Sequence, residues 1–210
     1  GNAFGGAGEW LVIEADESDG SLVRYHPEIG VMLNLDRDHK ELSELRGIFS
    51  TFRAQSRKFV VHGDRPDCLE IAGQDNFRFG IGNSSLPLPT GIDLLPDRVE
   101  FMLGEIKVTV PGPGMHTVEN ALAALAAGVC AGVDLATGAK ALAEFEGVGR
   151  RHELVGEHRH VRVFDDFAHN PAKVEAGISA AQPAAGGGRV LAVFQPHGYG
   201  PLRFLLEDFA

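Results

Sequence analysis

Cysteine and long apolar runs are both scarce in this chain of 210 residues. Only Cys68 and Cys130 occur, too few for the disulfide framework of a small secreted domain, and this scarcity fits a reducing compartment. No apolar stretch approaches the roughly 20 residues that a membrane-spanning helix needs. The first ten residues, GNAFGGAGEW, lack the basic start and the apolar core of a signal peptide. We therefore expect a cytoplasmic protein with no membrane contact.

Basic residues are outnumbered by acidic ones: 19 Lys and Arg stand against 29 Asp and Glu, which gives a formal net charge of −10. This balance argues against a nucleic acid partner, because the phosphate backbone of nucleic acids needs a basic protein surface. A phosphate-bearing small molecule is still compatible with the composition, because a binding site can be locally basic or can use a metal ion.

Several catalytic signatures are missing as well. Neither cysteine has a histidine at a motif spacing, and the G-x-S-x-G nucleophile motif does not occur. The phosphate-binding loop G-x-x-x-x-G-K-[ST] is also absent from these residues. The sequence therefore contains neither a recognisable motif for a catalytic nucleophile nor a phosphate-binding loop.

The composition is that of an ordinary soluble globular protein, with 44% hydrophobic and 23% charged residues. The length suffices for one large domain or two small ones. The chain opens in a glycine-rich loop and closes at RFLLEDFA, which has the pattern of an amphipathic helix without a cap or a glycine stop. We expect the chain to be a piece of a longer protein.

Hydrophobic patterning predicts a mostly parallel α/β sheet in the first part of the chain. Residues 10–14, 29–35 and 58–62 form apolar runs typical of buried strands. Residues 40–56 place apolar side chains at helical spacing between the second and third runs. The order strand, helix, strand indicates parallel pairing.

The pattern changes between residues 77 and 110, where short alternating segments are broken by Gly and Pro. We predict that the second of these segments, residues 98–110, forms a hairpin that turns near Gly104, as an antiparallel insert or edge. An Ala-rich helix over residues 113–132 follows, and then a second helix that Asp134 caps.

A charged, glycine-punctuated stretch over residues 146–157 is the best candidate for a domain boundary. Beyond it we predict a strand at 160–167, a helix with Pro171 in its first turn, and another strand at 189–195. We therefore expect one domain over residues 1–147 and the start of a second α/β domain over residues 148–210.

Polar clusters follow four predicted strands: EADESD, NLDRDH, DDFAHNP and QPHGYG. Ligands of open parallel sheets collect beyond the carboxyl ends of the strands. In the first two clusters, Glu14 and His39 could share Mg²⁺, or Mn²⁺, with substrate phosphates. A solvated acidic turn and a histidine bonded to its own loop explain the same residues about equally well, and Asp16, Glu17, Asp19, Asp36 and Asp38 compete as ligands.

The other candidates also have simpler explanations. Arg150 and Arg151 suit bidentate phosphate contacts, but they could be solvated surface residues. Asp166 and His169 precede a helix N-terminus that favours anions, or they form its capping turn. Asn120 could contact a base edge or the backbone, and His197 follows a strand directly. Six further histidines have no part in a predicted site. We expect His116 at the start of a helix, and we expect five others at the surface: His26, His62, His152, His158 and His160.

Read together, these segments resemble the Mur ligases, the ATP-dependent amide-forming enzymes of peptidoglycan precursor synthesis. The segments that carry the resemblance are, in order, IEADESDGS, NLDRDH, PGPGMHTVENALAALAAG, GVGRRHE, DDFAHNP and FQPHGYGPLRF. The resemblance covers nearly the whole chain and is weakest between Cys68 and Val110. It implies a central ATP-binding domain without its phosphate-binding loop over residues 1–147. The truncated start of a Rossmann-like C-terminal domain follows over residues 148–210.

The resemblance also implies roles for single residues. Glu14 and His39 correspond to metal ligands, Asn120 to an adenine contact, and Arg151 to an arginine that reaches the γ-phosphate. Asp166 and His169 correspond to a turn that contacts the nucleotide, and His197 to the place where the incoming amino acid and the acyl phosphate are handled. One departure is Thr117, where the relatives usually have a second Asn beside the adenine.

The activity implied is the ATP-dependent joining of an amino acid or peptide to UDP-N-acetylmuramate, in synthesis or recycling of the precursor. The 210 residues by themselves are expected to be inactive, since the phosphate-binding loop is missing from them. A folylpolyglutamate-synthetase-like ligase shares the same architecture and is the nearest alternative. A metal-dependent hydrolase is a second alternative, which leaves the arginine pair unexplained, and a non-catalytic fragment is a third.

Overall fold

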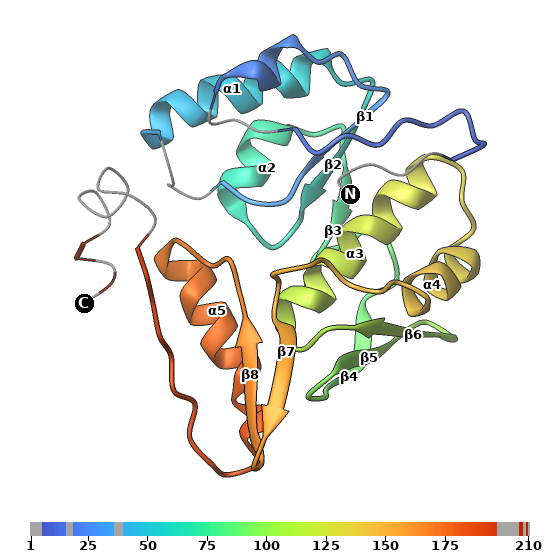
Figure 1. Ribbon diagram of the computed structural model, residues 1–210. Coiled ribbons are helices and arrows are strands. Elements are labelled where there is room, and N and C mark those ends of the chain that lie inside the picture. Colours follow the sequence, from blue (N-terminus) through green and yellow to red (C-terminus); the bar gives the residue numbers. More distant parts are fainter. Residues whose placement is uncertain (1–5, 16–18, 36–39, 197–205, 208, 210) are drawn as a thin grey trace.

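The computed structural model describes residues 6–15, 19–35, 40–196, 206–207 and 209, and it has a mixed α/β architecture (Figure 1). The described helices include none that is long and apolar enough to cross a membrane. The mixed α/β fold class predicted from the sequence is confirmed.

A parallel sheet of three strands forms the first layer of the fold. It has the order β1-β2-β3, with β1 at Ile29–Met32, β2 at Lys58–His62 and β3 at Phe77–Phe79. Both neighbouring pairs are parallel. The connections carry α1 (Leu42–Gln55) and α2 (Pro66–Ala72), so the predicted strand–helix–strand order is confirmed.

A second sheet is antiparallel and consists of β4 (Pro89–Leu94), β5 (Arg98–Leu103) and β6 (Ile106–Pro111). The predicted hairpin forms between β5 and β6, where Gly104 has a φ of 60° that suits glycine. Strand β3, which comes before this insert in the chain, pairs in parallel with β2. Three residues are too few for their alternation to reveal the direction of pairing.

Two helices complete this part of the chain: α3 (Met115–Cys130) and α4 (Leu135–Ala143). Both were predicted. The carboxylate of Asp134 accepts a hydrogen bond from the backbone N–H of Thr137, so the predicted cap of α4 is also confirmed.

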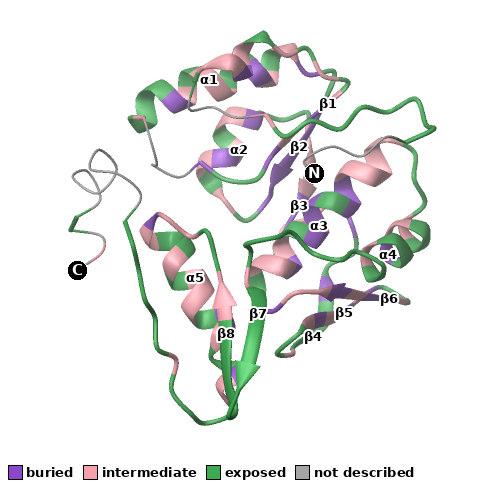
Figure 2. Ribbon diagram, viewed as in Figure 1, coloured by how far each residue is buried: buried purple, intermediate pink, exposed green. Residues whose placement is uncertain are grey.

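The apolar core lies on both faces of β2. Val60 belongs to a cluster formed with α3, α4 and the antiparallel sheet, whereas Val61 belongs to a cluster formed with α1 and α2. Both side chains are fully buried. Figure 2 shows the same contrast, with buried residues on β2 and α3 and mostly exposed residues on the last third of the chain.

The last third contains the hairpin of β7 (Glu153–His158) and β8 (Val161–Asp165), followed by α5 (Pro171–Ala181) and the short 3₁₀ turn η2 (Pro183–Ala185). The helix begins as predicted, with Pro171 in its first turn. Asn170 caps it by accepting the backbone N–H of Lys173. Strand β7 was not predicted, because its sequence is charged and all six of its residues are exposed.

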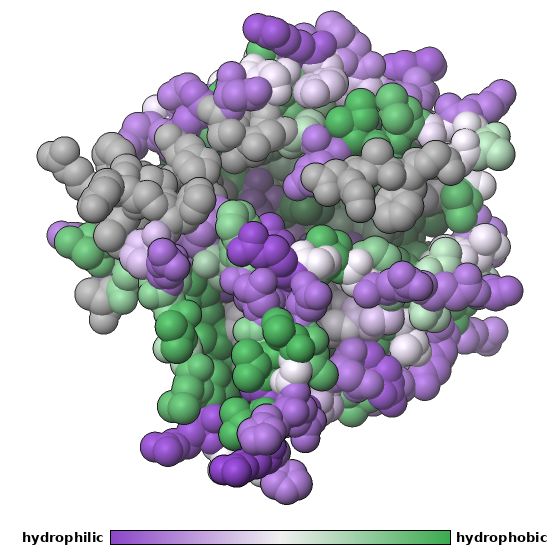
Figure 3. All heavy atoms as spheres, in the orientation of Figure 1, coloured by the Kyte–Doolittle hydropathy of each residue, from purple (hydrophilic) through white to green (hydrophobic). Residues whose placement is uncertain are grey.

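Two predicted strands do not form. Residues 10–14 and 189–195 have no regular secondary structure, and the exposed fractions of Val12 and Val193 are 92% and 99%. A strand needs a neighbour for its backbone hydrogen bonds, and no described strand pairs with either run. Figure 3 shows exposed apolar side chains around the β7–β8 hairpin, and Val161 and Val163 of β8 are both exposed.

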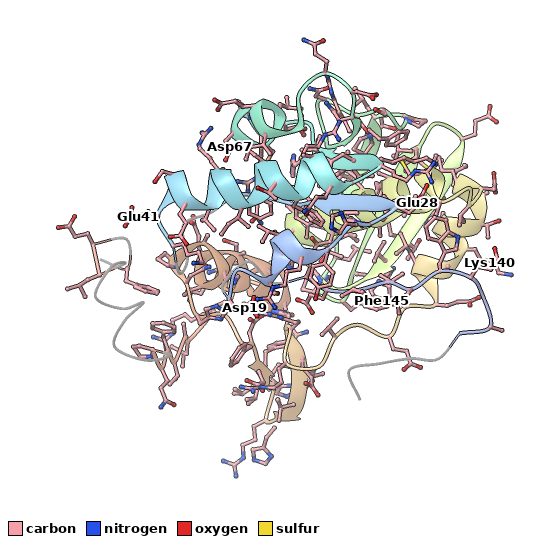
Figure 4. The ribbon with its side chains drawn as sticks, turned by 90° about the horizontal axis from the view of Figure 1, so that it is seen from above. Asp19, Glu28, Glu41, Asp67, Lys140 and Phe145 are labelled. Atoms are coloured by element: carbon pink, nitrogen blue, oxygen red, sulfur yellow. The ribbon has the colours of Figure 1, made fainter. Side chains whose placement is uncertain are left out.

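A small 3₁₀ turn, η1 (Ser21–Arg24), precedes β1. Asp19, labelled in Figure 4, accepts the backbone N–H of Ser21 over 2.7 Å. This hydrogen bond lowers the pKa of the Asp19 carboxyl group. Asp19 therefore acts as a turn residue in the described structure.

The β7–β8 hairpin provides a stability test. Its two-residue loop consists of Arg159 (φ 48°) and His160 (φ 64°), a pair of positive φ angles that Asn-Gly adopts with little strain. We predict that the double substitution Arg159→Asn, His160→Gly raises the free energy of unfolding by about 1 kcal/mol, measured by urea denaturation. A decrease in stability would show that the two side chains are needed for contacts that outweigh the strain.

Candidate functional site

The N-terminus of α3 meets the last third of the chain at a junction (Figure 1). Gly114, just before the helix, lies against α5: a Cβ added to it would be 3.2 Å from Cβ of Ala180. His116 in the first turn is close enough to Asp166 and His152 for its charge to interact with theirs. Residues from both predicted domains therefore surround this junction.

Arg150 lies in the loop before β7 and is held by several contacts. Its Nε donates to Oδ2 of Asp165 over 3.2 Å, and its guanidinium lies 4.7 Å from the centre of the Phe167 ring. Its backbone carbonyl accepts the N–H of Phe167 over 2.9 Å. This arginine is already engaged within the protein.

Arg151 differs from its neighbour. No hydrogen bond or ion pair within the described ranges involves its exposed guanidinium, which lies 5.9 Å from the centre of the Phe167 ring. The residues on either side, Arg150 and His152, have φ angles of 59° and 50°. Such left-handed conformations cost free energy in non-glycine residues and cluster at functional sites. Arg151 thus presents a positive charge that has no ion-pair partner among the described residues, on a loop with a constrained backbone.

Asp166 organises the turn that follows β8. One carboxylate oxygen accepts the backbone N–H of His152 over 3.0 Å, and the other accepts that of Ala168 over 2.8 Å. Asn170, not Asp166, caps α5. Asp166 therefore connects the arginine loop, residues 150–152, to the turn before α5. Asp166 itself is exposed.

His169 is oriented by two neighbours. Its Nδ1 lies 3.0 Å from the carbonyl oxygen of Phe167, and its Nε2 lies 3.4 Å from Nζ of Lys173. A carbonyl can only accept and an ammonium can only donate, so Nδ1 carries the proton and Nε2 is the acceptor. The ring of His169 is therefore held between the turn at Phe167 and the first turn of α5.

His152 is not a simple surface residue, contrary to the prediction. Its ring stacks on Phe164 with the ring centres 4.4 Å apart, and its Nε2 is a buried atom without a hydrogen-bond partner in the described part of the chain. Burial lowers the pKa of His152, and burial likewise lowers that of His116, although the charge of Asp166 acts in the opposite direction on both.

His62 was also assigned to the surface, and this assignment is wrong: only 4% of it is exposed. Its Nδ1 accepts the backbone N–H of Asp64 over 3.3 Å, and its Nε2 lies 3.6 Å from Oε1 of Glu119 on α3. The approach of His62 lowers the pKa of Glu119. The available signal was its position at the carboxyl end of a predicted parallel strand, the edge at which ligands collect.

Comparisons with known proteins agree on one family. Residues 150–210 match the family described as Mur ligase, glutamate ligase domain. The UDP-N-acetylmuramate–L-alanine ligase of Synechococcus sp. (strain RCC307) is 37% identical over 230 residues, which cover 100% of this chain and 48% of that protein. The whole chain is thus similar to a Mur ligase, and its residues 150–210 match the family itself. It spans about half the length of the curated relatives that it matches.

Solved Mur ligase structures share the fold. UDP-N-acetylmuramate–alanine ligase from Thermotoga maritima aligns with a TM-score of 0.75 at 23% identity, over 92% of this chain and 46% of that one. MurF ligase from the same organism, in complex with ADP, aligns with a TM-score of 0.60 at 20% identity, over 77% of this chain and 40% of that one. The family match begins at residue 150, close to the boundary at 148, which stays a prediction.

The helix α3 carries the candidate base contact. Asn120 is exposed on it, one turn beyond His116. The hydroxyl of Thr117 donates to the backbone carbonyl of Pro113 over 2.8 Å. Thr117 is therefore occupied at the start of the helix, and Asn120 is the amide side chain that stays open to a ligand.

Only one of the two predicted metal ligands lies within the described residues. Glu14 is exposed on an irregular segment, not at a strand end, and His39 lies outside the described residues. His197, the third predicted catalytic residue, lies outside them as well. The described residues contain no group of three His, Cys, Asp or Glu side chains placed to hold a metal ion. These assignments stay predictions.

The lowered pKa values of His116 and His152 lead to a prediction about pH. Because both lie below the ordinary value of 6.5, the folded protein binds fewer protons than the unfolded chain as the pH falls through about 6.5, and it loses stability. The double variant His116→Gln, His152→Gln should lose less stability than the unsubstituted protein between about pH 7.5 and about pH 5.5.

Urea unfolding at the two pH values measures this difference. His158→Gln serves as the matched control, since His158 is exposed on β7 and should leave the pH dependence as it is. An equal loss of stability in the double variant and the control would contradict the burial of the two rings.

Proposed function

We propose that the native protein containing this chain joins an amino acid or a peptide to UDP-N-acetylmuramate at the expense of ATP. The observation that carries the proposal is the arrangement at the junction. Asp166 holds the backbone of His152, next to Arg151. His116, one turn before Asn120 on α3, lies close enough to Asp166 and His152 for their charges to interact. The names of the curated relatives and the ADP complex of a structural neighbour support the choice of substrates.

The reaction proposed is activation of the sugar-linked carboxylate by ATP to an acyl phosphate, followed by attack of the amine and release of phosphate. The protein contributes positioning and charge in such transfers rather than covalent chemistry. Arg151 would balance the charge of the transferred phosphoryl group, and Asn120 would hydrogen-bond the adenine edge.

Asp166 and His169 would act from the side of the last third of the chain. Asp166 keeps the arginine loop and the turn before α5 in one arrangement. His169 lies beside Lys173, with its Nε2 3.4 Å from Nζ of that residue. His197 belongs to the proposal as the residue that handles the incoming amino acid, on the strength of the resemblance.

A divalent cation, Mg²⁺ or Mn²⁺, is part of the proposal, with Glu14 and His39 as its protein ligands. The donor set is chemically suitable, because proteins often hold Mg²⁺ with one or two carboxylates and leave its other positions to phosphate oxygens and water, and Glu14 is exposed. When bound, the ion would neutralise charge on the phosphates. The metal-dependent hydrolase predicted as an alternative receives no support from a group of donors in the described residues.

Substitution of Arg151 tests the proposal. We predict that Arg151→Gln in the native protein lowers kcat for ATP-dependent amide formation by about 10³-fold, because a charge that balances the transferring phosphoryl group is lost. Asn120→Ala should instead raise KM for ATP and leave kcat nearly unchanged. Steady-state kinetics with ATP, UDP-N-acetylmuramate and L-alanine separate the two effects.

Arg162→Gln is the control, since it removes the same charge from an exposed position on β8 and should leave both constants unchanged. Full activity of the Arg151 variant would exclude the role proposed for that residue. Absence of ATP-dependent amide formation by the native protein would refute the function itself.

A further inference from the structure

We propose that Arg150 is a positioning residue: paired with Asp165, it fixes the loop from which Arg151 reaches the ligand and does not contact the ligand itself. This inference rests on the proposed function, in which Arg151 meets the transferring phosphoryl group. It separates the roles of two adjacent arginines that the sequence leaves equivalent.

The side chains of the two residues have different surroundings. The Nε of Arg150 donates to Oδ2 of Asp165 over 3.2 Å, and its guanidinium makes a cation–π contact 4.7 Å from the centre of the Phe167 ring. A guanidinium that makes an ion pair with a carboxylate and a cation–π contact has fewer donors left for a ligand, and its charge is partly balanced within the protein. Arg151 makes no ion pair among the residues that the structure describes, and its guanidinium lies farther from the same ring, at 5.9 Å.

The backbone around Arg151 is fixed from both sides. The N–H of Arg150 donates to Oε2 of Glu153 over 2.7 Å, and that of Arg151 donates to the carbonyl of Val148 over 3.1 Å. The N–H of His152 donates to Asp166 over 3.0 Å. Three successive N–H groups therefore have defined acceptors.

This anchoring accounts for the unfavourable φ angles of Arg150 and His152, 59° and 50°. A left-handed conformation is strained for a residue other than glycine and persists only where its surroundings determine it. The carbonyl of Arg150 and its ring contact both go to Phe167, and its ion pair goes to the strand end at Asp165. Arg150 therefore connects the loop to β8 and to the turn behind it.

The Arg150–Asp165 pair is exposed: 62% and 44% of the two side chains are accessible. Exposed ion pairs contribute little to global stability. Loss of the pair should therefore leave the melting temperature nearly unchanged and act on the orientation of the loop. A misplacement of about 1 Å can reduce turnover by up to about 100-fold.

A double-mutant cycle in the native protein tests the inference. We expect Arg150→Gln to lower kcat for ATP-dependent amide formation by about 10- to 100-fold with little change in KM for ATP, and Asp165→Asn to reproduce this loss. The variant with both Arg150→Gln and Arg151→Gln should be no slower than Arg151→Gln alone, because Arg150 acts only through Arg151. Arg162→Gln is the control for the removal of one positive charge.

Two results would overturn the inference. If the losses multiply in the double variant, Arg150 acts on the ligand independently of Arg151; if Arg150→Gln is fully active, the pair does not position the loop. A measurement without turnover separates this outcome from failure of the proposed function. The Nε proton of Arg150 should exchange with solvent at least about tenfold faster in Asp165→Asn than in the unsubstituted protein, as NMR detects, because its acceptor is weakened. Equal exchange rates would refute the positioning pair whatever reaction the protein catalyses.

Discussion

Burial of β2 on both faces is the constraint on which the rest of the structure depends. Val60 and Val61 point to opposite sides of the sheet and have no exposed surface, so each of the two apolar clusters is closed by this one strand. The carboxyl end of β2 is consequently fixed. His62 stands there against Glu119, which lies in the α3 helix beside Asn120. Core packing thus determines where the first half of the candidate site lies.

The last third of the chain is held in a different way. Its hairpin has little buried surface, and its order depends on polar contacts: Arg150 with Asp165, and Asp166 with the backbone of His152 and Ala168. These contacts lie beside Arg151 and His169. In this part of the molecule, the interactions that shape the chain are also those that shape the candidate site, whereas around β2 the two are separate.

Local signals in the sequence predicted the fold where they are self-sufficient. Helical spacing located α1, and Asp134, Pro171 and Gly104 marked two helix starts and a hairpin turn. Strands at 10–14 and 189–195 were predicted and do not form, because pairing requires a neighbour that composition does not reveal. Burial of His62 and His152 likewise depends on segments distant in the sequence. Arg151, Asp166 and His169 were selected through the resemblance of GVGRRHE and DDFAHNP to Mur ligase segments. The structure does not test the proposed metal pair, because His39 lies outside the described residues.

The central claim is that one nucleotide contacts both halves of the junction. Amide hydrogen exchange of the native protein with and without ATP and Mg²⁺, followed by mass spectrometry, tests it most directly. Bound nucleotide should slow exchange together at the start of α3, over residues 150–152 and over residues 166–169, because the ligand and domain closure protect all three segments. If bound nucleotide slowed exchange at the start of α3 but left the exchange rates of residues 150–152 and 166–169 unchanged, the account would be contradicted.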